Sequence, residues 1–381
     1  MKFFINPKKV SIYFLLITQF LGALNDNIFK LLVVYLLIHV QGTENAPTIL
    51  SIAGAVFVVP FLLFSSAAGV LADKISKQKI IVLTKIAEAA IMALSIPAVI
   101  FQTDYMLYFL LFLMAAQSSV FGPSKYGIIP EIVEKKKVSK ANGLLTSLTF
   151  LAIIIGTFLA SFIIDITHYN FFFTALTCFA IAVLGFLASL KIEKTPAKKS
   201  TRKINPLFFI EIYQTLSLAS KRKYLITACL GSAFFLFVGG YVQLNIIPYA
   251  IEALSLTEVG GGYLFLPTAV GIAVGSVIAG KLTKEKVNPA LSCIAGIFMS
   301  LFLILLSFFS HHLIAVILIL AVLGMFGGMF LIPFDSFIQI KSPEARRGQI
   351  IAAASFLSFI GVLAASGYLY LMSSIFDFSP S

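Results

Sequence analysis

A narrow polar stripe crosses the first long apolar run of this sequence, Tyr13–His39. At 100° per residue, Gln19, Asp26 and Lys30 fall within a helix sector of about 40°, with Gly22 beside them. A carboxylate at the middle of a bilayer-length helix costs about 2.5–3.5 kcal/mol on insertion scales, so such groups normally face a bundle interior or a wet cavity. The stripe therefore predicts a buried polar site.

The charges of this stripe admit two interpretations. Asp26 and Lys30 are four residues apart, so they could form an internal ion pair that only holds helices together. Alternatively, they could bind a solute or a coupling ion in a transporter cavity. Lys85 and Glu88, three residues apart, leave the same two alternatives open, whereas Lys125 stands near a span end where its side chain can reach the interface.

Composition places these residues in a polytopic membrane protein of the all-α class. Of the 381 residues, 59% are hydrophobic and only 12% are charged, and the mean hydropathy is +1.01. A soluble domain could not keep that much apolar surface from water. The apolar runs have the length of membrane-spanning helices and lack the alternation of a β-barrel.

Eleven apolar runs are long enough to span a bilayer. They are Tyr13–His39, Ile49–Leu71, Ile80–Phe101, Met106–Ile129, Gly143–Ile164, Phe171–Leu190, Tyr224–Tyr249, Gly261–Gly280, Ala290–Phe309, Ile314–Ile340 and Gln349–Phe376. Of the 28 basic residues, all but Lys30, Lys85 and Lys125 lie in connections on one side of these runs. This positive-inside pattern predicts a cytoplasmic N-terminus, and it explains the net charge of +12 without nucleic acid.

One long hydrophilic connection divides the spans into six and five. We therefore predict an N-terminal six-helix bundle over residues 1–190, a cytoplasmic linker over 191–223 and a C-terminal five-helix bundle over 224–381. Within the linker, Pro206–Ser220 mixes apolar and polar residues at helical spacing. This pattern predicts a short helix at the inner membrane surface, attracted by anionic lipid.

The two halves of the sequence repeat in the same sense. Residues 72–80 align with residues 279–287 at an offset of 207, and Pro60 and Pro267 keep that offset. Pro123 and Pro333 are related by an offset of 210. Same-sense repeats of this kind are typical of transporters whose two bundles are related by an axis along the membrane normal.

Particular stretches resemble a known family. Gly69 to Lys79, with the sequence GVLADKISKQK, resembles the basic loop between the second and third helices of the major facilitator superfamily. Four further stretches resemble the lysophospholipid-transporter branch of that family: residues 19–30, 121–131, 140–144 and 327–333 with Gln339. The resemblance covers nearly the whole chain. The form of the branch often fused to a phospholipid acyltransferase is the most similar, since Lys85-Ile86-Ala87-Glu88 suits that form.

This resemblance implies a flippase that works by alternating access. It would move lysophospholipids, mainly lysophosphatidylethanolamine, from the outer to the inner leaflet of a bacterial inner membrane. The implied partners are membrane lipid, the lysophospholipid substrate, and a cytoplasmic phospholipid acyltransferase or acyl-carrier-protein synthetase that restores the second chain. Matching positions imply substrate-binding roles for Asn25, Asp26, Asn27, Lys30, Lys125 and Tyr126.

A zwitterionic head group needs a carboxylate for its ammonium and a cation for its phosphate. We therefore assign Asp26 or Glu88 to the ammonium, and Lys30, Lys85 or Lys125 to the phosphate. In the family, the acidic and basic residues of the loop hold the two bundles together on the cytoplasmic side. The residues assigned to gating are Gly69, Asp73, Lys74, Lys77, Asp335 and Gln339.

The sequence departs from the family pattern in three places. Lysines stand at the usual arginine positions of the loop, which weakens bidentate pairing. Asp335 stands where the branch usually has a neutral amide. The sequence stops at Ser381, where a twelfth helix should begin, so we expect a truncated C-terminal bundle or a fragment of a longer or fused protein.

Other functions leave different signatures. An acyltransferase of the fused type needs His and Asp five positions apart, and none of the four histidines has such a partner. Without a phosphate-binding Gly-Lys-Ser/Thr loop or a metal-ligand cluster, the chain is predicted to be no enzyme and to need no cofactor, metal or nucleic acid. Two alternatives remain open: an ion-coupled exporter of small solutes or drugs with the same fold, and a non-transporting membrane module that partners an acyltransferase.

Overall fold

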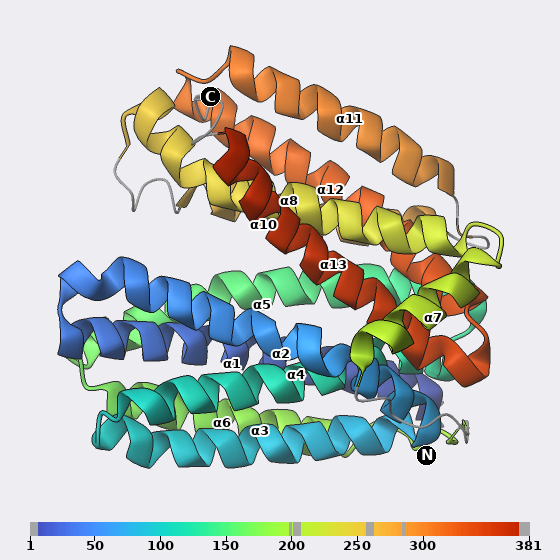
Figure 1. Cartoon of the computed structure of the whole chain (residues 1–381), viewed down its shortest axis with the longest axis horizontal. Helices are drawn as coiled ribbons and strands as arrows, with labels where there is room; N and C mark the ends of the chain where they lie inside the picture. Colours follow the sequence, from blue (N-terminus) through green and yellow to red (C-terminus); the bar gives the residue numbers. More distant parts are fainter. Residues whose placement is uncertain are drawn as a thin grey trace, which may run out of the picture. The chain divides into compact units, whose positions relative to one another are not determined.

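The computed structural model describes residues 7–197, 200, 207–256, 263–283, 287 and 289–372, and in these it is built of helices without strands (Figure 1). The helices are α1 Pro7–Gln41, η1 Thr43–Asn45, α2 Ala46–Lys74, α3 Lys77–Ile100, α4 Asp104–Ile132, η2 Lys135–Lys137, α5 Val138–Ile166, α6 Phe171–Ser189, α7 Phe208–Ser220, α8 Leu225–Leu254, α10 Phe265–Leu282, α11 Pro289–Phe308, α12 Leu313–Lys341, η3 Glu344–Arg346 and α13 Arg347–Tyr370.

The described helices confirm the prediction of an all-α membrane protein with eleven spans. Eleven of them, α1–α6, α8 and α10–α13, are long and apolar enough to cross a membrane. Pro123 and Pro333, which the sequence repeat relates, both lie inside spanning helices, α4 and α12. Residues 373–381, where a twelfth helix was expected to begin, lie outside the described residues.

The chain divides into two compact units. The first contains the described residues of 1–133, 152–215 and 343–353, and the second those of 134–151, 216–342 and 354–381. Helix α5 therefore begins in the second unit and continues in the first, while α13 begins in the first and continues in the second. The predicted domain boundaries at 190 and 223 follow the order of the chain and stay a prediction.

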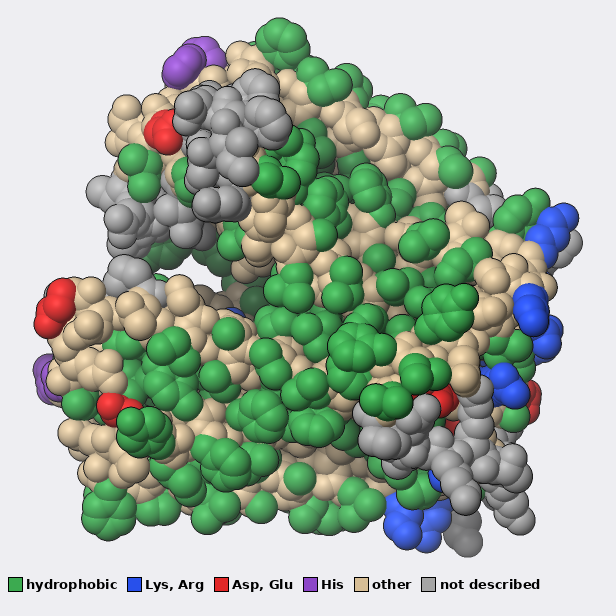
Figure 2. Space-filling view, in the orientation of Figure 1, with side chains coloured by type: hydrophobic (Ala, Val, Ile, Leu, Met, Phe, Trp, Pro, Cys, Tyr) green, Lys and Arg blue, Asp and Glu red, His purple; other side chains and the backbone are tan. Residues whose placement is uncertain are grey.

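The core of the first unit encloses α1. Phe29, Leu32 and Leu36 of α1 are fully buried, together with Met92 of α3 and Leu111 of α4. Many other hydrophobic side chains of the spans are exposed and form much of the visible surface (Figure 2). Because α1 is packed inside its unit, the polar stripe of α1 is held against neighbouring helices.

Close backbone contacts join α10 and α12 in the second unit. Gly271 and Gly275 are four residues apart on α10, as are Gly324 and Gly328 on α12. A Cβ atom added at any of these four positions would overlap the backbone of the facing helix. Small residues at this spacing let membrane helices approach closely, which replaces the missing hydrophobic driving force in lipid.

Replacing Gly275 with alanine should destabilise the second unit, because the new Cβ would lie 2.6 Å from the carbonyl carbon of Met325. Overpacking of this kind costs about 1–3 kcal/mol. Gly239→Ala on α8 is the matched control, since a Cβ there meets nothing within 4 Å. The control should keep its stability or gain up to about 1 kcal/mol. Thermal unfolding in detergent measures both, and equal melting temperatures would contradict the packing described.

Candidate functional site

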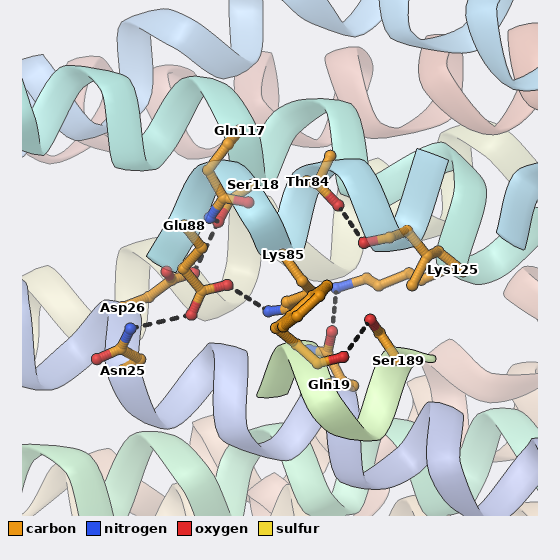
Figure 3. Close-up of polar contacts among 12 residues, drawn as sticks. Gln19, Asn25, Asp26, Thr84, Lys85, Glu88, Gln117, Ser118, Lys125 and Ser189 are labelled. Atoms are coloured by element: carbon orange, nitrogen blue, oxygen red, sulfur yellow. Dashed lines mark hydrogen bonds and ion pairs between the residues drawn. The ribbon is translucent and has the colours of Figure 1, made fainter. Parts of the chain in front are cut away.

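A cluster of polar side chains lies inside the first unit, between α1, α3 and α4 (Figure 3). It contains residues from the predicted stripe and from the predicted pair on α3, and we call it the polar cluster. Its members are Gln19, Asn25 and Asp26 of α1, Lys85 and Glu88 of α3, and Gln117, Ser118 and Lys125 of α4.

Lys85 and Glu88 form a closed internal pair. The Lys85 Nζ lies 2.5 Å from Glu88 Oε2, and both side chains are at most 2% exposed. Asn25 Nδ2 donates a 2.9 Å hydrogen bond to the other carboxylate oxygen of Glu88. Gly22 leaves room for the ammonium, since a Cβ there would collide with Lys85 Nζ. These contacts favour the structural interpretation of the pair, in which it is an internal pair of α3 that α1 contacts through Asn25.

Asp26 is paired less completely. Ser118 Oγ donates a 2.9 Å hydrogen bond to Asp26 Oδ2, whereas the buried Oδ1 has no hydrogen-bond partner among the described residues. The internal ion pair with Lys30, one of the two alternatives, does not form: no Lys30 nitrogen lies within the 4.0 Å of a salt bridge to Asp26 in the described structure. Lys30 Nζ instead lies 5.5 Å from the ring centre of Phe57 on α2.

Lys125, assigned to substrate binding from the sequence, points into the polar cluster and does not take the alternative position at the interface. Its Nζ donates a 3.0 Å hydrogen bond to Gln19 Oε1 and lies 5.1 Å from the ring centre of Tyr126. The ring of Phe121 lies near the ammonium groups of both Lys125 and Lys85. Among the described residues, Lys125 has no salt bridge to a carboxylate.

Two charges of the polar cluster have no salt bridge among the described residues: the Asp26 carboxylate and the Lys125 ammonium. Both residues lie in the close-up of the polar cluster (Figure 3). A carboxylate and an ammonium can bind a cation and an anion respectively, and together they suit a zwitterion. The charges of Lys85 and Glu88 are already neutralised by each other.

The structure brings most predicted binding residues together, with two exceptions. Asn27 Nδ2 donates to the Ala23 carbonyl of its own helix at 2.8 Å, and Lys30 faces α2. Ser118 was not predicted as a site residue, although Gln117-Ser118-Ser119 is a polar run within an apolar span and indicates a buried site. Gln117 Nε2 donates to Ser118 Oγ, so α4 supplies a relay to Asp26.

The predicted gating residue Asp73, at the end of α2, binds the start of α13 within the first unit. Its carboxylate accepts hydrogen bonds from the backbone amides of Gly348 at 2.7 Å and Gln349 at 3.0 Å. Unpaired amides and the helix dipole at a helix start favour such a carboxylate. Gly69, one turn earlier, packs against the same segment, where a Cβ would lie 2.8 Å from the Gly348 carbonyl oxygen. We call this the Asp73 contact.

The remaining gating candidates have separate neighbours. Lys77 forms a buried salt bridge of 2.8 Å with Glu131 of α4, while Lys74 is half-buried. In the second unit, Asp335 of α12 accepts a 2.9 Å hydrogen bond from Ser232 of α8. Gln339, one turn later, donates to Asn142 of α5 at 3.0 Å. The gating roles of all these residues stay predictions.

Comparison with known proteins gives consistent matches. Residues 15–366 match the model of the family described as Major Facilitator Superfamily. The lysophospholipid transporters LplT of Escherichia coli O1:K1 / APEC and of Shigella dysenteriae serotype 1 are each 25% identical over 336 residues, or 87% of this chain and 80% of theirs. These matches confirm the resemblance identified from the sequence, and the relatives named here are transporters.

Solved structures of known transporters have the same fold. The fucose:proton symporter FucP of E. coli aligns with a TM-score of 0.78 and 17% identity, over 98% of this chain and 94% of FucP. The human organic anion transporter MFSD10 aligns with a TM-score of 0.76 and 12% identity, over 95% of this chain and 94% of MFSD10. At these identities the likeness extends to the fold alone.

Substituting one partner of the buried pair should destabilise the first unit. In Lys85→Met, Glu88 becomes a buried carboxylate with only the Asn25 amide left of its two partners, and breaking a buried pair costs about 3–5 kcal/mol. The double variant Lys85→Met/Glu88→Leu removes both charges and should recover most of that loss. Thermal unfolding in detergent compares the three proteins, and a single variant as stable as the double would contradict a closed pair.

Removing the Asp73 carboxylate should loosen the start of α13. In Asp73→Ala, the amides of Gly348 and Gln349 lose their acceptors, so we expect them to exchange hydrogen about tenfold faster. Lys79→Ala, at an exposed position close by in the sequence, is the control and should leave that exchange unchanged. Hydrogen exchange with mass spectrometry on a peptide covering 345–353 gives the readout. Equal exchange in both variants would show that other contacts hold this segment.

Proposed function

Because this chain is a multi-pass membrane transporter that belongs to the Major Facilitator Superfamily, we propose that its substrate is a lysophospholipid. It moves the lipid, with a head group like that of lysophosphatidylethanolamine, from the outer to the inner leaflet of a bacterial inner membrane. The head group passes through the protein while the acyl chain stays in lipid. The lysophospholipid-transporter names of the relatives support this choice.

The observation that carries the proposal is the pair of available charges in the polar cluster. Asp26 keeps a buried oxygen without a hydrogen-bond partner among the described residues, and an ammonium group can donate to it. Lys125 is neutralised by no carboxylate within salt-bridge distance in the described structure, and a phosphate can accept from it. A phosphoethanolamine head group supplies both missing partners at once.

Lys85 and Glu88 position the site and do not bind the head group in this proposal. The two side chains pair within α3, and Asn25, which precedes Asp26 on α1, donates a hydrogen bond to Glu88 of that pair. Lys30 of α1, beside Phe57, is a second cation in addition to Lys125 of α4. It would bind the phosphate at another stage of transport. In this proposal the two most deeply buried charges of the polar cluster, those of Lys85 and Glu88, neutralise each other, which a low-dielectric interior favours.

Alternating access would let the site face each leaflet in turn. The Asp73 contact is the proposed gating element, since it holds the start of α13 in the first unit while the rest of α13 belongs to the second. With the N-terminus in the cytoplasm, the basic loops and this contact face the cytoplasm. A cytoplasmic acyltransferase or acyl-carrier-protein synthetase is then the partner that converts the delivered lipid.

Uptake of labelled lysophosphatidylethanolamine tests the proposal. Cells that lack their own transporter would express the chain, and conversion to a two-chain phospholipid by a cytoplasmic acyltransferase reports arrival at the inner leaflet. Asp26→Asn and Lys125→Met should each lower uptake about tenfold or more, because each removes a charge-assisted hydrogen bond to the head group.

Asp165→Asn is the matched control, because it makes the same change at an exposed position near the end of α5. We expect wild-type uptake from this variant. No uptake by the wild-type chain at normal membrane levels would contradict the lipid substrate. Equal uptake by Asp26→Asn, Lys125→Met and the control would contradict the assignment of the site.

A further inference from the structure

Helix α7 of the linker has two opposite faces of different character. Glu211, Ile212, Thr215 and Ala219 are buried, each at 5% exposure or less. The opposite face carries exposed apolar side chains: Phe209, Ile210 and Tyr213. The prediction of a short helix here is confirmed by the structure, but the burial of a carboxylate on it was not foreseen.

The buried face of α7 is tied to the Asp73 contact. Gln349 Nε2 donates a 3.0 Å hydrogen bond to Glu211 Oε1. The backbone amide of the same Gln349 donates to Asp73. The linker also reaches this place through Ser200, whose amide donates to the Asp73 carbonyl oxygen at 3.2 Å. One residue of α13 therefore joins the linker helix to the end of α2.

Helix α7 lies close in the chain to a membrane-spanning helix. Only four residues separate the end of α7 from Leu225, the first residue of the spanning helix α8. A helix of this length is about 20 Å long, so all of it lies near the point where the chain enters the bilayer. Three of the four residues are the exposed cations Lys221, Arg222 and Lys223.

The chemistry of this surface suits one partner. Aromatic and aliphatic side chains beside a basic run bind the interface of a bilayer with anionic head groups. In Figure 2, hydrophobic side chains cover the place where Figure 1 shows α7, and basic side chains lie next to them.

We propose that α7 binds the anionic phospholipids of the inner leaflet and that the hydrogen bond between Glu211 and Gln349 makes the Asp73 contact depend on this binding. Glu211 is 5% exposed, and a buried carboxylate that loses a partner is costly. Moving α7 away would break the hydrogen bond between Glu211 and Gln349 and so weaken the packing of the start of α13. Anionic lipid would stabilise α7 in the position where Glu211 binds Gln349 and, through Gln349, would stabilise the Asp73 contact.

Hydrogen exchange in nanodiscs of defined lipid tests this coupling without a transport assay. The full chain would be placed in two kinds of disc. One contains phosphatidylcholine alone, and the other contains phosphatidylcholine with about one third phosphatidylglycerol. Exchange of a peptide covering 345–353 reports the amides bound by Asp73. In the wild-type chain, phosphatidylglycerol should slow this exchange about fivefold, a change of the size that one hydrogen bond provides.

Two variants should abolish the effect of phosphatidylglycerol. The triple change Lys221→Ala/Arg222→Ala/Lys223→Ala removes the basic run, and Gln349→Leu removes the bond to Glu211 while keeping its own backbone bond to Asp73. Glu211→Gln keeps an acceptor for Gln349 and should keep the lipid effect. If Gln349→Leu fails to fold, Glu211→Leu breaks the same bond from α7.

The matched charge control is Lys135→Ala/Lys136→Ala/Lys137→Ala, which removes three exposed cations from another basic loop. This control should respond to phosphatidylglycerol as the wild-type chain does. Three results would overturn the proposal: no lipid effect in the wild-type chain, an equal loss in the charge control, or a full effect in Gln349→Leu. The first two would refute specific binding by α7, and the third would refute its coupling to the Asp73 contact.

Discussion

The buried Lys85–Glu88 pair is the interaction on which the arrangement of the first unit depends. A charge inside a bilayer-spanning bundle must be neutralised by a partner, or its desolvation penalty destabilises the fold. Glu88 satisfies this requirement for Lys85, and Asn25 binds the remaining carboxylate oxygen. The Asn25 hydrogen bond ties α1 to this pair of α3, and Asp26 and Lys125 lie in the same polar cluster without a salt bridge among the described residues.

The second unit is held together largely by close packing. Gly271 and Gly275 bring α10 against α12, where side-chain volume would keep the helices apart. The sequence repeat shows the contrast at one place, since Asp73 corresponds to Gly280 at the offset of 207. Asp73 binds the amides at the start of α13, whereas Gly280 packs closely on the backbone at the start of α5. These equivalent positions therefore hold the starts of two helices in different ways, Asp73 by hydrogen bonds and Gly280 by close packing.

The sequence predicts the spans well because hydropathy is a local property of each helix. It also predicts that Lys85 and Glu88 can meet, since their spacing on one helix determines that geometry. The same reasoning fails for Asp26 and Lys30, because α4 offers Ser118 to Asp26 and α2 offers Phe57 to Lys30. Partners on other helices depend on tertiary packing. For the same reason, the mixed pattern of α7 indicates a surface helix but does not indicate that Glu211 is buried against Gln349.

The proposed function depends on recognition of an ammonium group of the transported lipid by Asp26. A direct test compares lysophosphatidylethanolamine with lysophosphatidic acid, which has the phosphate but no ammonium, in liposomes containing the purified chain. We predict that Asp26→Asn slows transport of lysophosphatidylethanolamine about tenfold and leaves that of lysophosphatidic acid nearly unchanged. If transport of both lipids slows equally, Asp26 supports the structure or the transport cycle and does not recognise the head group.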